Sequence, residues 1–135
     1  MNLNLKNKKA LVTGSSHGIG LEIAKCLSKE GCIVAINGRN KKKLFKASKL
    51  VSKSFPIQGD VTNRKSAKKV IDNAAKNLGS IDILVCNVGS GKTEKTGEES
   101  YDDWEKIFKK NFWSVVNIVK ESQKFLIKSK AVSKF

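Results

Sequence analysis

Three glycines that follow a short apolar segment are the feature of this chain best suited to chemistry. The segment Ala10-Leu11-Val12 leads into Thr13-Gly14-Ser15-Ser16-His17-Gly18-Ile19-Gly20. Gly14 lets the backbone turn sharply, whereas Gly18 and Gly20 let the start of a helix approach a pyrophosphate and pack on the strand. The free N–H groups and the dipole at that helix start favour an anion. The spacing therefore predicts a dinucleotide phosphate site, and the alternative is a tight turn without a ligand.

A basic residue stands where an NAD site has a carboxylate, at the end of the second predicted strand. No Asp or Glu occurs between Glu30 and Asp60, and the strand ends in Asn37-Gly38-Arg39-Asn40. The guanidinium of Arg39 can bind a ribose 2′-phosphate, a contact worth roughly 1.5–3 kcal/mol. Ser15 and His17 are expected to reach the same phosphate. We therefore predict NADP(H) rather than NAD(H) as the cofactor, and the alternative for Arg39 is a solvated loop charge.

Two further segments follow predicted strands at the edge where open α/β sheets bind ligands. Asp60-Val61 follows the third strand, where a carboxylate can accept a hydrogen bond from an adenine amino group or simply cap a helix. Gly89 allows the backbone to pass near a ribose, and Asn87 can tie the fourth strand to the neighbouring loop. The predicted cofactor-binding residues are Gly14, Ser15, Ser16, His17, Gly18, Ile19, Gly20, Arg39, Asp60, Val61, Asn87 and Gly89.

Short apolar runs alternate with amphipathic segments along the chain. The predicted strands are residues 10–12, 33–36, 55–58 and 81–85; the predicted helices are 18–30, 41–51, one from Thr62 or Asn63 to Leu78, and 101–126. Buried strands joined by helices predict a parallel sheet with right-handed crossovers. The fold class is therefore α/β, a partial Rossmann-type three-layer sandwich of about four parallel strands in the order 3-2-1-4, with helices on both faces. Pro56 supports an edge position for the third strand.

The charge of the chain is strongly positive, with 27 Lys and Arg against 12 Asp and Glu and a net charge of +15. The lysines are spread over every predicted helix, and no aromatic residues alternate with them as in a base-stacking surface. A solvated lysine-rich surface is therefore predicted, without specific nucleic-acid binding. The alternative is a basic nucleic-acid-binding domain, whose affinity would fall steeply with salt.

Apolar runs and cysteines give expectations about membrane, compartment and metal. No run approaches the roughly 20 apolar residues that span a bilayer, and the first residues lack an apolar signal-peptide core. We expect no membrane partner and a cytoplasmic location. The cysteines Cys26, Cys32 and Cys86 are predicted to be buried free thiols. With one histidine in the chain, no metal site is expected.

Together these motifs resemble the short-chain dehydrogenase/reductase family. The likeness runs from about Lys8 to Leu126 and rests on Thr13-Gly14-x-x-x-Gly18-Ile19-Gly20, Asp60-Val61, Asn87-x-Gly89 and Asn111. It implies NAD(P)(H) binding and hydride transfer to or from a carbonyl or alcohol. It also implies a catalytic part for Asn111, acting through a water, and a homo-oligomer that uses helix 101–126. The alternative for Asn111 is a polar residue that kinks the helix.

The resemblance also implies catalytic residues that these 135 positions do not contain. The family has a serine on the next strand and then Tyr-x-x-x-Lys, whereas the single tyrosine here, Tyr101, is followed four residues later by Glu105. Residues 1–135 are therefore expected to be a single partial NAD(P)-binding domain without the C-terminal catalytic portion. We expect a truncated chain that is inactive, and poorly stable because strand 81–85 would be an exposed apolar edge. The alternative is a non-catalytic dinucleotide-binding or interaction module.

Overall fold

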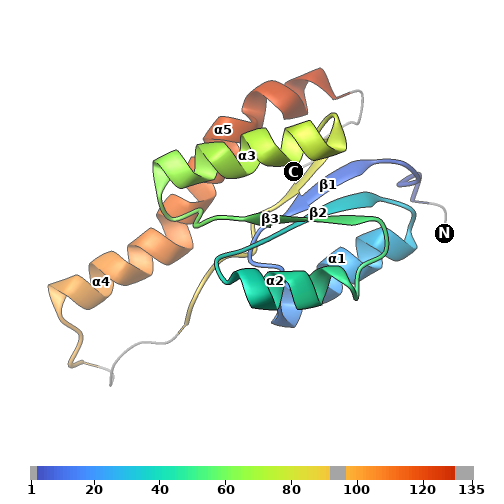
Figure 1. The fold of residues 1–135 in the computed structure, drawn as a ribbon. Helices are drawn as coiled ribbons and strands as arrows, with labels where there is room; N and C mark the ends of the chain where they lie inside the picture. Colours follow the sequence, from blue (N-terminus) through green and yellow to red (C-terminus); the bar gives the residue numbers. More distant parts are fainter. Residues whose placement is uncertain (1–2, 92–96, 130–135) are drawn as a thin grey trace.

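The sheet of this protein is parallel and four-stranded, in the order β3-β2-β1-β4. A computed structural model describes residues 3–91 and 97–129. Its strands are β1 (Lys9–Val12), β2 (Ile33–Gly38), β3 (Ser54–Gln58) and β4 (Ile83–Val85). Figure 1 shows the strands side by side with helices above and below them. The predicted fold class and strand order are confirmed by this arrangement. Its physical basis is that the crossover helices bury the short apolar strands on both faces.

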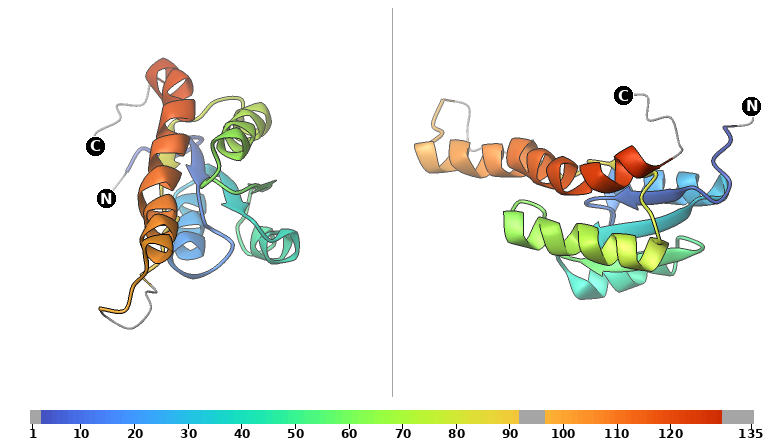
Figure 2. Two further views of the ribbon diagram at one scale, coloured as in Figure 1. Left: turned by 90° about the vertical axis from the view of Figure 1, so that its left-hand side faces the viewer. Right: turned by 90° about the horizontal axis from the view of Figure 1, so that it is seen from above.

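The helices cover both faces of the sheet (Figure 2). On one face, α1 (Gly18–Lys29) and α2 (Lys41–Ser48) pack over a core that includes Ala24 and Leu44. On the other, α3 (Arg64–Leu78) and α5 (Ser114–Lys128) cover a second core that includes Ile71 and Ile118. Since each βαβ crossover starts where its strand ends, α1, α2 and α3 all begin at the carboxyl edge of the sheet.

The strand register brings the ends of the strands level at that edge. Val12 at the end of β1 pairs with Ile36 of β2 and with Val85 of β4. Pro56 pairs with Ile36 in the edge strand β3, as its missing N–H group predicts. The segments that follow the four strands therefore emerge beside one another.

The fourth strand is shorter than predicted and is the other edge of the sheet. Ile81 is buried in the core but precedes β4. Asp82 accepts a hydrogen bond from the Lys9 N–H at 2.8 Å and from the Ser129 hydroxyl at 2.6 Å. These contacts hold the start of β4 through a side chain, and β4 pairs with β1 alone among the described strands.

The long helix predicted over residues 101–126 is interrupted. It consists of α4 (Tyr101–Phe108), a π-helical turn η1 (Lys109–Trp113) and α5. The described part of this helix buries few residues, which are Ser114, Ile118 and Ser122 of α5, while α4 and η1 bury none. Four large aromatic residues of α4 and η1 are about half exposed: Trp104, Phe108, Phe112 and Trp113.

The three cysteines differ in how far they are buried. All three cysteines are free, but only Cys32 is buried; Cys26 lies exposed on α1 and Cys86 is partly buried. The prediction of three buried thiols is therefore wrong for Cys26, whose helix position faces solvent.

Among the described residues, no helix is both long enough and apolar enough to cross a bilayer.

Candidate functional site

A cleft of about 770 Å³ opens at the carboxyl edge of the sheet. Its walls come from the glycine turn, the ends of β2 and β3, the loop after β4 and one residue of η1. The lining residues are Gly14, Ser16, His17, Gly18, Ile19, Asn37, Gly38, Arg39, Gly59, Asp60, Val61, Thr62, Asn87, Val88, Gly89, Ser90 and Lys110. Of the residues predicted to bind a cofactor, all but Ser15 and Gly20 thus line one cleft.

The glycine turn has the backbone that its spacing predicts. Gly14 and Gly18 have φ values of 60° and 58°, in the left-handed region that glycine adopts without strain. Gly20 lies behind the turn, where a β-carbon would collide with the Asn87 amide and lie 2.5 Å from the Gly14 carbonyl oxygen. Its missing side chain is thus needed for the approach of the turn to the loop after β4.

Asn87 and Thr13 join that loop to the glycine turn. The Asn87 side-chain amide donates to the Gly14 carbonyl at 3.0 Å, and the Asn87 backbone N–H donates to the Thr13 hydroxyl at 3.0 Å. The Thr13 hydroxyl in turn donates to the Val85 carbonyl at 3.2 Å. The predicted tie between β4 and the turn is present, with Thr13 as a second member.

Ser15 has a different place from the one predicted for it. Its side chain is fully buried, and its hydroxyl donates to the Val12 carbonyl at 2.7 Å and accepts from the Asn37 N–H at 2.9 Å. The hydroxyl is therefore engaged by β1 and β2, and Ser15, which does not line the cleft, positions the turn against β2; its part in binding a phosphate stays a prediction. Asn37 extends this network, because its amide donates to the carbonyls of Ile57 and Gly59 at 3.0 and 3.2 Å.

Ser16 is the hydroxyl that stands next to the end of β2. A β-carbon on Gly38 would lie 3.1 Å from the Ser16 side chain, so the two residues are in close contact. The Ser16 hydroxyl is also 3.2 Å from the His17 Nδ1 atom. Arg39 follows directly with a 70 % exposed side chain, and Gln58 fixes its backbone by donating to the Arg39 carbonyl at 3.0 Å. A hydroxyl, an imidazole and a guanidinium thus share one corner of the cleft.

Among the residues that the structure describes, Asp60 is the only carboxylate that lines the cleft. Both the backbone N–H and the hydroxyl of Thr62 donate to its Oδ1 atom, at 2.9 and 2.7 Å, and Arg39 lies 3.9 Å from Oδ2. Burial acts to raise the pKa of Asp60, but the hydrogen bonds from Thr62 and the charges of Arg39 and Lys109 outweigh it, so that its pKa is lowered. The carboxylate is therefore ionised and keeps Oδ2 directed toward Arg39.

Asn111 lies in the π-helical turn and holds the loop after β4. Its side chain accepts from the Ser90 N–H at 2.7 Å and donates to the Ser90 carbonyl at 3.0 Å. A β-carbon on Gly89 would lie 3.1 Å from the Asn111 oxygen, so the contact needs a small residue there. These bonds give Asn111 a positioning role, while its predicted catalytic part stays a prediction.

Sequence reasoning did not identify several residues of the cleft wall. Val88, Ser90 and Lys110 reach it through the contact between η1 and the loop after β4, which no local pattern encodes. Gly59 is different, since a glycine at a strand end was a signal that could have been used. A β-carbon at Gly59 would collide with Val70 of α3.

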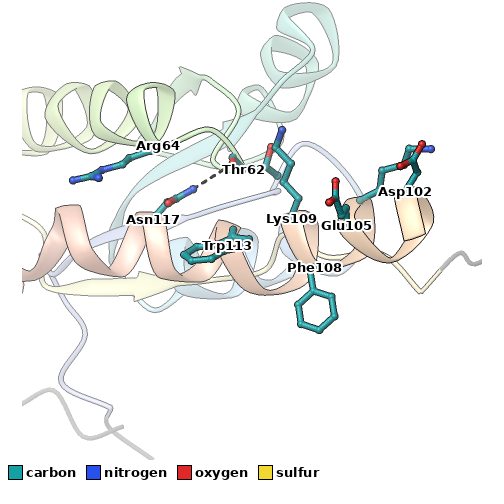
Figure 3. Close-up of a pocket in the computed structure, with 9 residues that line it drawn as sticks. Thr62, Arg64, Asp102, Glu105, Phe108, Lys109, Trp113 and Asn117 are labelled. Carbon is teal, nitrogen blue, oxygen red and sulfur yellow. Dashed lines mark hydrogen bonds between the residues drawn. The ribbon is translucent and has the colours of Figure 1, made fainter. Parts of the chain in front are cut away.

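A second cavity of about 590 Å³ lies beside the first, between the start of α3 and the α4–η1–α5 helix (Figure 3). Side chains of both charges surround it, among them Arg64, Glu105 and Lys109. The Asn117 amide donates to the carbonyls of Val61 and Thr62 at 3.2 and 3.3 Å, which ties α5 to the end of β3. Apart from Thr62, this cavity shares no residue with the cleft.

Comparison with known protein families agrees with this geometry. The family model described as short chain dehydrogenase matches residues 8–133. The chain therefore belongs to the short-chain dehydrogenase/reductase family, whose members bind a nicotinamide dinucleotide on a Rossmann-type fold.

Individual relatives give the same result. Glucose 1-dehydrogenase of Gluconobacter oxydans is 34% identical over 114 residues, covering 81% of this chain and 43% of the relative. A short-chain dehydrogenase/reductase of unknown function from Caenorhabditis elegans, solved with cofactor, superposes with a TM-score of 0.86 at 30% identity, covering 94% of this chain and 51% of that one. L-sorbose reductase from Gluconobacter frateurii, solved with NADPH and L-sorbose, superposes with a TM-score of 0.85 at 27% identity, covering 93% of this chain and 50% of that one. The chain spans about half the length of the curated relatives it matches.

Replacing Gly20 tests the close approach of the turn to the loop after β4. In Gly20→Ala, the added carbon must displace the Asn87 amide and the Gly14 carbonyl. We expect the free energy of unfolding to fall by about 1–3 kcal/mol, as for other overpacked sites, measured by urea denaturation. Gly91→Ala is the control, because a β-carbon there meets no atom within 4 Å. Equal stability of the two variants would contradict the contact.

The lowered pKa of Asp60 predicts how its contribution to stability depends on pH. A carboxylate whose folded pKa is lowered stabilises the fold above the unfolded pKa of about 3.9 and loses this effect as the pH falls through the folded pKa. We therefore expect the stability difference between the wild type and Asp60→Asn to be largest near neutral pH and to shrink toward about pH 3. Urea denaturation over this range measures it, with Glu98→Gln, an exposed carboxylate outside the cleft, as control. A difference that grows on acidification would rule the argument out.

Proposed function

We propose that this chain binds NADP(H) in the cleft, with the adenosine ribose toward the corner formed by Ser16, His17 and Arg39. The observation that carries the proposal is the position of Arg39. It lines the cleft at the end of β2, where the residues from Gly31 to Gly59 contain no carboxylate to accept from a 2′-hydroxyl. The 2′-phosphate of NADP(H) at this corner would meet the Arg39 guanidinium and the Ser16 hydroxyl.

The residues of the cleft fit the other parts of a dinucleotide. The first turn of α1 contains no acidic residue, and no side-chain hydrogen bond caps its start at His17, so its N–H groups are suited to the pyrophosphate. Asp60 supplies a carboxylate for adenine, and Val61, whose side chain is buried in the core, follows it in the wall of the cleft. Gly89 leaves the loop after β4 without a side chain beside the ribose. When bound, the cofactor would supply or accept a hydride.

For the whole protein, we propose an oxidoreductase that transfers hydride between NADP(H) and a carbonyl or alcohol substrate. The family supports the reaction class, and the L-sorbose reductase complex with NADPH supports the cofactor. Within the 135 residues, the cleft binds and orients while Asn111 holds its outer loop. No Tyr-x-x-x-Lys occurs among them, so we propose that residues 1–135 are a cofactor-binding part that binds without turnover.

We also propose that the chain forms a homo-oligomer through four aromatic residues of α4 and η1, which are Trp104, Phe108, Phe112 and Trp113. All four are about half exposed, and this many neighbouring aromatic side chains on one helix are typical of an interface. Light scattering should give a mass above that of one chain, and Phe108→Ser combined with Trp113→Ser should reduce it to a monomer. A monomeric wild type would refute the interface.

Binding by Arg39 variants tests the cofactor. Arg39→Ala should weaken NADPH binding by about 10- to 150-fold, the equivalent of the roughly 1.5–3 kcal/mol of a charge-assisted contact. NADH binding should change much less, because it lacks the 2′-phosphate. Fluorescence titration of both nucleotides measures the two dissociation constants.

Arg64→Ala is the matched control, since Arg64 is the only other arginine and lies outside the cleft. Equal losses for NADPH and NADH in Arg39→Ala would contradict the assignment of the 2′-phosphate. Incubating the same samples with NADPH and simple carbonyl compounds tests whether the chain binds the cofactor without turnover. Steady NADPH oxidation by the purified chain would contradict binding without turnover, and binding alone would leave a non-catalytic module as its role.

A further inference from the structure

The first turn of α2 contains three consecutive lysines, Lys41, Lys42 and Lys43, and this is the only run of three in the chain. All three side chains are exposed. Within the described residues, no ion pair involves any of them, whereas lysines of α1, α3, α4 and α5 do pair with Asp or Glu. These three charges are therefore not neutralised by the fold itself.

The local structure does not need positive charge at this point either. Cations at the beginning of a helix oppose its dipole, and like charges in one turn repel one another. The cap of α2 is a neutral contact, in which the Asn40 side chain accepts from the Lys43 backbone N–H at 3.0 Å. The buried positions of α2 are Leu44 and Ala47. Helix formation and packing thus explain the neighbours of the three lysines but not the lysines.

The position of the run at the mouth of the cleft does suggest a use. Arg39 lines the cleft, and α2 begins two residues later. The backbone between them is held on one side by the cap and on the other by the Gln58 amide, which donates to the Arg39 carbonyl. The lysines themselves do not line the cleft. They therefore add positive potential at its entrance without a place in the binding contact.

We infer that Lys41, Lys42 and Lys43 guide the dinucleotide to the cleft electrostatically, and that they speed the association of NADPH more than that of NADH. The inference rests on the proposed function, since it concerns the ligand of the same cleft. It assigns two separate tasks to neighbouring cations: the lysine run acts on the association rate, and Arg39 acts on the dissociation rate.

The preference for NADPH follows from its charge. A phosphate monoester adds about −1.5 to −2 charges at pH 7, and the attraction at a distance scales with the product of the charges. Such guidance acts over roughly 10 Å at 0.1 M salt and is screened beyond this range. Groups that act only at a distance raise the association rate and leave the dissociation rate nearly unchanged.

Stopped-flow fluorescence of NADPH and NADH binding to the full chain tests the inference. The variant Lys41→Gln/Lys42→Gln/Lys43→Gln removes the run. The control Lys29→Gln/Lys76→Gln/Lys128→Gln removes the same charge at the last turns of α1, α3 and α5, toward the opposite edge of the sheet. At low salt, we expect the NADPH association rate of the first variant to fall about 10-fold below the wild type, with a smaller fall for NADH. The dissociation rates and circular dichroism spectra should be unchanged, and about 0.5 M salt should abolish the difference.

Two results with the variants would overturn the inference. Equal association rates in the two triple variants would mean that only net charge matters. A faster dissociation of NADPH from the first variant would mean that the lysines contact the bound ligand. A wild-type chain that binds neither nucleotide would refute the proposed function itself, and that outcome is visible before any variant is made.

Discussion

The contact between the glycine turn and the loop after β4 is the constraint on which the cleft depends. It joins Gly14 to Asn87, which are 73 residues apart, through one hydrogen bond, and Thr13 adds a second. The contact exists because β1 and β4 are neighbours in the sheet, and it requires a residue without a side chain at position 20. The strand order of the whole sheet thus determines the geometry of the cleft wall formed by the glycine turn and the loop after β4. The opposite wall is set in the same way, since Ser15 and Asn37 join the turn to β2 and Asn37 continues to β3.

Much of this could be predicted from the sequence because the relevant signals are local or follow from parallel connectivity. Apolar runs of strand length, glycines with left-handed backbone and a proline in one strand give the sheet and its order. The carboxyl ends of parallel strands then have to meet. The choice between Ser15 and Ser16 could not be made, because adjacent hydroxyls are equivalent as residue types. Which one faces the cleft depends on the conformation of Gly14 and on a buried partner from another strand.

The helix at 101–126 shows a different limit. Periodicity identifies apolar positions but does not say whether the chain itself or another molecule covers them. Trp104 and Trp113 fit the helical pattern and yet remain half exposed, whereas two serines of α5 are buried against the rest of the fold. The π-helical turn could not be predicted from the sequence either, because it adds a residue to one helical turn without changing the amino-acid composition. It carries Asn111, and its contact with Ser90 brings the helix to the cleft.

The distribution of charge around the cleft is uneven. Arg39 and Lys110 line the cleft and the lysines at the start of α2 border it, while Asp60, the one carboxylate among the described lining residues, is engaged by Thr62 and faces Arg39. An ionised Asp60 with a lowered pKa is suited to accept a hydrogen bond and is a weak general base, because its lowered pKa means a low affinity for a proton. The charges of the described cleft residues are therefore suited to an anionic ligand, as the proposed NADP(H) would be.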